Sequence, residues 1–79
     1  MYLKVVSLKG IEFEGQIKSL NIPTQNGEIT VLDNHRPIIS VLKPGLAIIT
    51  KIDNEQKEVE ISSGFLEVDN NNHLNVLIN

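Results

Sequence analysis

Two short stretches carry the side-chain types that enzymes use for catalysis. Ser62-Ser63-Gly64 suggests a nucleophilic serine, but it lacks the Gly-x-Ser-x-Gly turn that exposes such a residue in hydrolases, and a β-bulge or bend explains it more simply. Asp33-Asn34-His35-Arg36 gathers an acid, an imidazole and a guanidinium. Catalysis there would need a second carboxylate or a serine within reach. We therefore predict no catalytic residue, and we expect a solvated corner or a partner contact at residues 33–36.

The sequence is equally poor in cofactor and metal ligands. It has no cysteine, which excludes thiolate metal sites and disulfides. The two histidines, His35 and His73, have no acidic or histidine cluster at ligand spacing. Glu58 and Glu60 alternate along one strand and indicate a wet strand face. The glycines are isolated, so no phosphate-binding loop is present. We predict neither a cofactor nor a metal.

Composition narrows the class of partner. The chain has 79 residues, which predicts one domain spanning 1–79, and a formal net charge of −3 with a pI near 5.2. Nucleic-acid modules need a basic footprint, and only 4% of the residues are aromatic. No Lys/Arg cluster is present to bind anionic lipid, and no apolar run approaches membrane-spanning length. A protein partner, a small ligand or a purely structural role remains.

The elements that would position these residues are strands throughout. Apolar residues recur with a period near two, and no segment keeps a helical period over three turns. Asn26-Gly27 and Pro44-Gly45 are turn signals between such runs. The expected strands are 2–8, 11–22 (one strand or a pair, bent at Gly15), 28–32, 38–42, 46–52, 57–62, 65–68 and 73–78. This spacing predicts an antiparallel sandwich or barrel.

Several of these strands are apolar on both faces, which a sandwich of this size does not need. Consecutive apolar pairs occur at 38–39, 41–42, 48–49 and 77–78. An antiparallel strand usually has one apolar and one wet face. We expect some of these side chains to be exposed and to mark an interface; a thick core with local bulges is the alternative.

Three pieces of the sequence, in order and in register, resemble the N-terminal β-domain of the epsilon subunit of F-type rotary ATP synthases. They are Val5-Val6-Ser7 with Phe13-Glu14-Gly15, then Gly27-Glu28-Ile29 through Asn34-His35-Arg36-Pro37 to Leu42-Lys43-Pro44-Gly45, and Ser63 to Val68 with Leu74-Asn75-Val76-Leu77. Together they cover almost the whole chain. Arg36 stands where the family usually carries alanine.

The resemblance implies a flattened antiparallel β-sandwich of about ten short strands. It implies a non-catalytic rotor component of the central stalk, which couples the gamma subunit to the membrane c-ring during proton-driven ATP synthesis. The positions matching Ser7, His35, Ile39 and Ser40 would then face gamma. The position matching Glu28 would face the polar loops of the ring.

The resemblance ends where most family members continue into a C-terminal helical hairpin. We therefore expect a naturally short member, with an isolated domain as the alternative. It should be monomeric when isolated, and it should work peripherally at the cytoplasmic face of the bacterial plasma membrane, without inserting into the bilayer. A different class of function is also open at this point, namely a free-standing small β-barrel that binds a peptide or small ligand.

Overall fold

The computed structural model describes residues 1–79 and contains strands but no helix. The elements are β1 (Tyr2–Ser7), β2 (Gly10–Thr24), β3 (Gly27–Val31), β4 (Ile38–Leu42), β5 (Gly45–Lys51), β6 (Gln56–Ile61), β7 (Gly64–Val68) and β8 (His73–Ile78). The molecule measures 26 × 23 × 19 Å along its principal axes. It has no helix that could cross a membrane.

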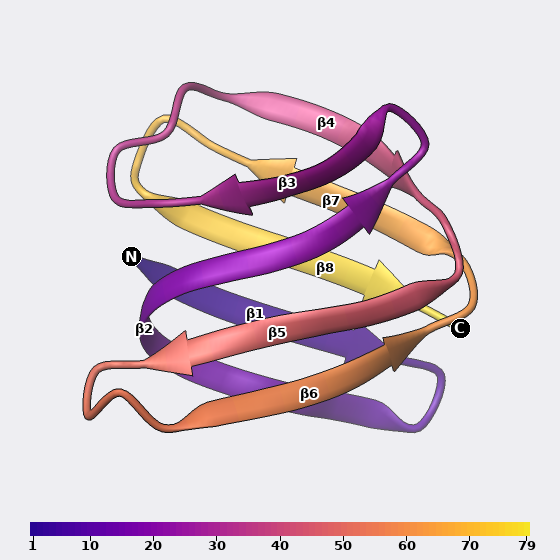
Figure 1. Cartoon of the computed structure of the whole chain (residues 1–79), viewed down its shortest axis with the longest axis horizontal. Helices are drawn as coiled ribbons and strands as arrows, with labels where there is room; N and C mark the ends of the chain where they lie inside the picture. Colours follow the sequence, from indigo (N-terminus) through magenta and orange to yellow (C-terminus); the bar gives the residue numbers. More distant parts are fainter.

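The strands form two layers that share one long strand. β4, β7, β8, β1 and the first half of β2 follow one another in the back layer. The second half of β2 pairs with β3 on one side and β5 on the other, and β6 pairs with β5 to complete the front layer. Figure 1 shows β2 passing from the back layer into the front layer.

Two irregularities let β2 make this passage. Val5 pairs with Phe13 and Val6 with Ile11, so Glu12 is an extra residue opposite β1. A second register shift against β5 falls between Ile17 and Ser19. Such bulges bend a strand and increase its twist, which turns a single sheet over on itself. The bend expected at Gly15 is therefore spread over the strand, which stays continuous from Gly10 to Thr24.

The core lies between the layers and follows the alternation of the strands. In β1 the buried side chains are Leu3 and Val5, and in β8 they are Leu74 and Val76. The cluster holds 15 buried apolar residues. Every buried polar side-chain atom has a hydrogen-bond partner. Because side chains fill the interior, the sandwich has no internal ligand chamber of the kind that a ligand-binding barrel would need.

The all-β sandwich is confirmed, with two differences of detail. The structure has eight strands instead of the about ten that the resemblance implies, and β2 is one continuous strand where the sequence allowed one strand or a pair. The pairing is antiparallel except between β1 and β8, which run parallel with Tyr2 opposite His73 and Val6 opposite Leu77. The β7–β8 hairpin fixes the direction of β8, and that direction coincides with the direction of β1.

Candidate interaction surfaces

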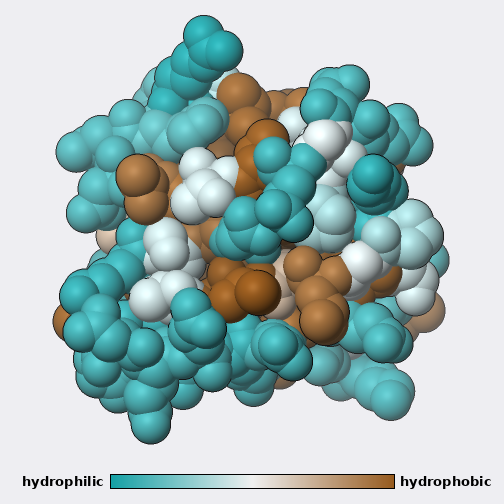
Figure 2. Space-filling model, in the orientation of Figure 1, coloured by the Kyte–Doolittle hydropathy of each residue, from teal (hydrophilic) through white to brown (hydrophobic).

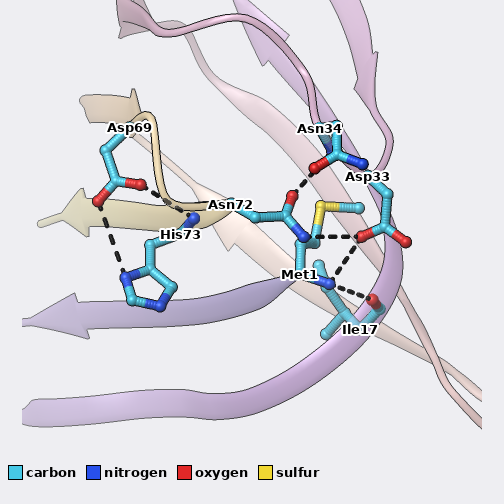
Figure 3. A network of polar contacts seen from close by, with 7 residues as sticks. All are labelled: Met1, Ile17, Asp33, Asn34, Asp69, Asn72 and His73. Atoms are coloured by element: carbon cyan, nitrogen blue, oxygen red, sulfur yellow. Dashed lines mark hydrogen bonds and ion pairs between the residues drawn. The ribbon is translucent and has the colours of Figure 1, made fainter.

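The corner at residues 33–36 is tied down at the left end of the molecule as drawn in Figure 1, where the N-terminus lies. The Met1 ammonium donates a hydrogen bond to Asp33 Oδ1 at 2.8 Å, and Asn72 Nδ2 donates to the same oxygen at 3.1 Å. The Asn34 amide donates to Asn72 Oδ1 at 2.8 Å (Figure 3). The hydrogen bond from the ammonium is the main cause that lowers the pKa of the Asp33 carboxyl. Asp33 therefore links the β3–β4 connection to the N-terminus and to the β7–β8 turn.

A second polar cluster occupies the β7–β8 turn beside it. Asp69 Oδ1 accepts hydrogen bonds from the Asn71 amide at 2.8 Å and the His73 amide at 3.1 Å. The hydrogen bond from Asn71 is the largest of the causes that lower the pKa of Asp69. His73 Nδ1 lies 3.8 Å from Asp69 Oδ2 (Figure 3). The His73 ring also packs edge-on against the Tyr2 ring. These contacts close the β7–β8 turn.

The serines and the carboxylates likewise form no catalytic arrangement. Ser62 and Ser63 make the bend between β6 and β7, as expected. The Ser63 hydroxyl bonds the Asn79 side-chain amide at the chain end. No three His, Asp or Glu side chains lie close enough together to hold a metal ion. The candidate residues therefore differ in the surface that each one offers to a partner.

His35 and Arg36 lie in the connection between β3 and β4. The His35 ring donates from Nδ1 to the Arg36 carbonyl oxygen at 2.7 Å, and the His35 amide donates to the Leu32 carbonyl oxygen at 3.2 Å. These bonds fix the ring orientation and leave Nε2 without a hydrogen-bond partner in the chain. Arg36 is exposed and has no ion-pair partner within the chain. The corner therefore presents two groups that an external partner can reach.

Ile39 and Ser40 lie on opposite faces of β4. Ile39 is 76% exposed on the outer face of the back layer. Ser40 is half-buried and points the other way, in register with the fully buried Leu66. Of the two, Ile39 offers an apolar contact to a partner. Ser40 is the less accessible of the two.

Ser7 is the last residue of β1, which ends at the right of Figure 1, away from the β3–β4 connection and the start of β4. Its hydroxyl donates to Glu12 Oε2 at 2.7 Å and accepts from the Lys9 amide at 3.1 Å. Both bonds stabilise the turn between β1 and β2. The structure therefore does not bring Ser7 together with His35, Ile39 and Ser40, although Ser7 and Ile39 border the same layer.

Glu28 is the second residue of β3, one residue after the Gln25–Asn26 turn, at the right end of the front layer in Figure 1. The buried Thr24 hydroxyl organises this turn, since it donates to the Gly27 carbonyl oxygen at 2.6 Å and accepts from the Asn26 amide at 3.1 Å. The Gln25 amide also bonds the Val41 carbonyl oxygen at 2.9 Å. Glu28 is exposed and has no cationic partner in the chain. Its carboxylate is thus held on a rigid base and faces solvent.

The outer face of the back layer carries a row of five apolar residues that crosses five strand segments. We call this row the apolar stripe; its members, in spatial order, are Val41, Phe65, Leu77, Val6 and Ile11. Phe65 is 53%, Leu77 54% and Ile11 57% exposed. Side chains opposite one another on neighbouring strands touch, so the members form one continuous surface.

The front layer has a different character. Its outer face carries Glu28, Thr30, Glu58 and Glu60, all exposed. In Figure 2, which shows this side of the molecule, teal and white side chains cover most of the surface and brown is confined to separate areas between them. The two outer faces therefore suit different partners.

Sequence reasoning predicted exposed apolar residues but missed the stripe as a surface. In each of the pairs 38–39, 41–42 and 77–78, one residue is exposed while the other is buried or half-buried, as expected. In the fourth pair, 48–49, one residue is half-buried and the other is buried. Which exposed residues become neighbours depends on strand register, above all on the parallel β1–β8 pairing. Two features of the sequence could have indicated the stripe. They are the adjacent apolar residues Val5 and Val6, and the apolar residue Ile11 directly after Gly10.

Comparison with known proteins adds the family relationship. The family model for the β-sandwich domain of the ATP synthase delta/epsilon chain matches residues 1–79. Curated relatives named ATP synthase epsilon chain include one from Dichelobacter nodosus, 39% identical over 64 residues, covering 81% of this chain and 45% of the relative. Another, from Sulfurovum sp., is 35% identical over 69 residues, covering 87% of this chain and 54% of the relative. The chain spans about half the length of these relatives.

Solved structures show the same fold. A chain in the mitochondrial ATP synthase of Euglena gracilis superposes with a TM-score of 0.90 at 21% identity, covering 96% of this chain and 48% of that one. A chain in the central stalk and c-ring structure of the Tetrahymena thermophila enzyme superposes with a TM-score of 0.81 at 15% identity, covering 99% and 62%.

Proposed function

This chain belongs to the family of ATP synthase delta/epsilon β-sandwich domains, and on that basis we propose that it is a non-catalytic rotor component of an F-type ATP synthase. In this role it joins the gamma subunit to the membrane c-ring and transmits rotation between them during proton-driven ATP synthesis. It works at the cytoplasmic face of the bacterial plasma membrane as a peripheral part of the complex. The observation that carries the proposal is the match of the family model over the whole chain.

The structure supports a coupling role through its rigidity and its two unlike faces. The interior is filled, and the turns at both ends are closed by hydrogen bonds. One outer face carries the apolar stripe, and the other carries the exposed carboxylates Glu28, Glu58 and Glu60. A part that transmits torque needs two attachment surfaces on a stiff body, and it needs no reactive group.

We assign the gamma contact to the back layer and its left corner. Ile39 is the apolar anchor there, and His35 offers its free ring nitrogen beside it. Ser40 is half-buried and offers less contact area. Ser7 borders the same layer at the far end, where its hydroxyl already serves the β1–β2 turn. Because Ser7 lies so far away, a single partner reaches both ends only if it extends across the layer.

We assign the ring contact to Glu28 at the right end of the front layer. The carboxylate has no partner in the chain, and the turn before it is held by Thr24. Basic groups on the polar loops of the ring would satisfy it. An exposed ion pair contributes about 0–1 kcal/mol, and desolvation at an interface raises this value.

The test of the gamma contact is co-purification with the gamma subunit from the same source. Ile39→Asp should weaken this association while leaving the fold intact, because truncating or charging an apolar interface anchor typically costs more than about 1 kcal/mol. Ile52→Asp is the matched control, since Ile52 is also exposed but lies in the β5–β6 turn. If the parent protein does not bind gamma, the proposed function is wrong. If Ile39→Asp binds as well as the control, the corner has been misplaced.

A further inference from the structure

We propose that the apolar stripe is the seat of one amphipathic helix of the gamma subunit, laid across the strands of the back layer with basic residues along one flank. The inference rests on the proposed function and makes it specific. The stripe is an apolar row that the strand register creates across five strand segments, and it contains three large exposed apolar side chains, Ile11, Phe65 and Leu77.

The dimensions of the stripe fit a helix. It spans four intervals between neighbouring strands, and strands lie about 4.8 Å apart, so it is about 19 Å long. A helix rises about 1.5 Å per residue, so about 13 residues cover this length. Apolar residues on one face of a helix recur about every 5–6 Å, close to the spacing of the stripe side chains.

The row beside the stripe defines the chemistry of the partner. In register it consists of Ile39, Glu67, Asn75, Lys4 and Glu14. Glu67 accepts a hydrogen bond from Asn75 at 3.3 Å, and Glu14 accepts one from Tyr2 at 2.5 Å. Neither carboxylate has a cationic partner in the chain. Lys and Arg residues on the near flank of the helix would complement them.

The same charges argue against a second copy of this chain as the occupant. Each copy carries a net charge of −3. Each flank holds two carboxylates, Glu67 and Glu14, against one cation, Lys4, so face-to-face pairing of two stripes would bring together flanks of the same net charge, and like charges at an interface cost free energy. A partner with a basic flank has the opposite effect.

The stripe also connects residues that are otherwise far apart. Val41 lies two residues after Ile39 on the same face of β4, and Val6 directly precedes Ser7 at the end of β1. A helix lying along the stripe would therefore pass from the Ile39 corner towards the Ser7 end. One partner element accounts for both ends of the proposed gamma surface.

The first test measures gamma binding by two stripe variants, Phe65→Asp and Ile11→Asp, with Ile52→Asp as the control. Circular dichroism and urea unfolding identify any variant that fails to fold, and because Ile11 lies near the start of β2, at the far end of the stripe from Val41, one of the two remains informative. We expect at least tenfold weaker binding for each folded stripe variant and no change for the control. Equal binding by all three overturns the inference but leaves the proposed function standing. Absence of gamma binding by the parent protein contradicts the proposed function itself.

The second test locates the helix and its flank. Photo-cross-linkers at positions 41 and 11 should attach to two gamma residues about 13 positions apart in one helix, because of the length of the stripe. Glu67→Lys should weaken binding, and the loss should shrink as salt is raised. Attachment to unrelated segments of gamma, or to a second copy of this chain, overturns the inference. So does a concentration-dependent dimer of the isolated protein that Phe65→Asp abolishes.

Discussion

Gly64, the first residue of β7, is the position where the structure leaves least room for a side chain. A Cβ placed there would lie 2.0 Å from the Leu77 carbonyl oxygen and 3.1 Å from Ile78 Cα, both of them backbone atoms of β8. The φ angle of Gly64 is +152°, in a region that other residues rarely adopt. Gly64→Ala must therefore push β8 away from β7.

Gly10 separates the two costs of this substitution. Its φ angle is +122°, but a Cβ there would meet nothing within 4 Å. Gly10→Ala should thus cost only the backbone strain, about 1–3 kcal/mol. Gly64→Ala should add about 1–3 kcal/mol for forcing packed backbone apart. A domain of this length has a free energy of unfolding of about 4–12 kcal/mol, so Gly64→Ala should remove a large part of it.

Urea unfolding followed by circular dichroism measures the difference. With an m-value of about 1–2 kcal/mol per molar urea for a small domain, the midpoint of Gly64→Ala should fall about 0.5–3 M below that of Gly10→Ala. Equal midpoints for the two variants would refute the argument, because the clash with Leu77 would then contribute nothing. Gly64→Ala should also weaken gamma binding, since it displaces the strand that carries Leu77.

Three further predictions follow from the turns and the charges. Asp33→Asn should lower the urea midpoint at pH 7, and the gap to the parent should narrow as the pH falls below about 4: the lowered pKa of Asp33 means that its stabilisation is present above the unfolded-state value and is lost as the carboxyl protonates in the folded state. An unchanged gap at pH 3 would contradict this. Thr24→Val removes a buried hydroxyl with two hydrogen bonds and should cost about 1–3 kcal/mol of unfolding free energy; Thr30→Val, on the exposed face of β3, is the control. Glu28→Lys should reduce retention of the catalytic part on membranes more than Glu28→Gln, with both effects smaller at high salt; equal retention of the three forms at low salt would exclude the ring contact.

Much of the fold could be predicted from local signals. Asn26-Gly27 and Pro44-Gly45 marked turns that the structure contains, and the period of two marked every strand. These signals work because turn chemistry and alternation are properties of a few consecutive residues. The bulge at Glu12 and the passage of β2 between layers could not be predicted, because they depend on which strand lies opposite.

The candidate surfaces also have some features that the sequence could predict and some that it could not. Exposure of Ile39 could be anticipated from its apolar neighbour Ile38, because two adjacent strand residues cannot both face the core. The stripe could not, since its members come from strands up to about 70 residues apart in the sequence. The hydrogen bond from the Ser7 hydroxyl to Glu12 could not be predicted either, because it forms only when the short turn brings the two residues together.

The parallel pairing of β1 and β8 has a mechanical consequence. The first and last strands lie side by side, while the two chain termini lie at opposite ends of the molecule (Figure 1). A force that pulls the termini apart therefore slides one strand along the other and loads the hydrogen bonds between them simultaneously. A hairpin pulled at its two ends opens one bond at a time. The outermost segments of this chain thus form a joint that resists shear along its length, which is the direction in which a load between its two ends would act.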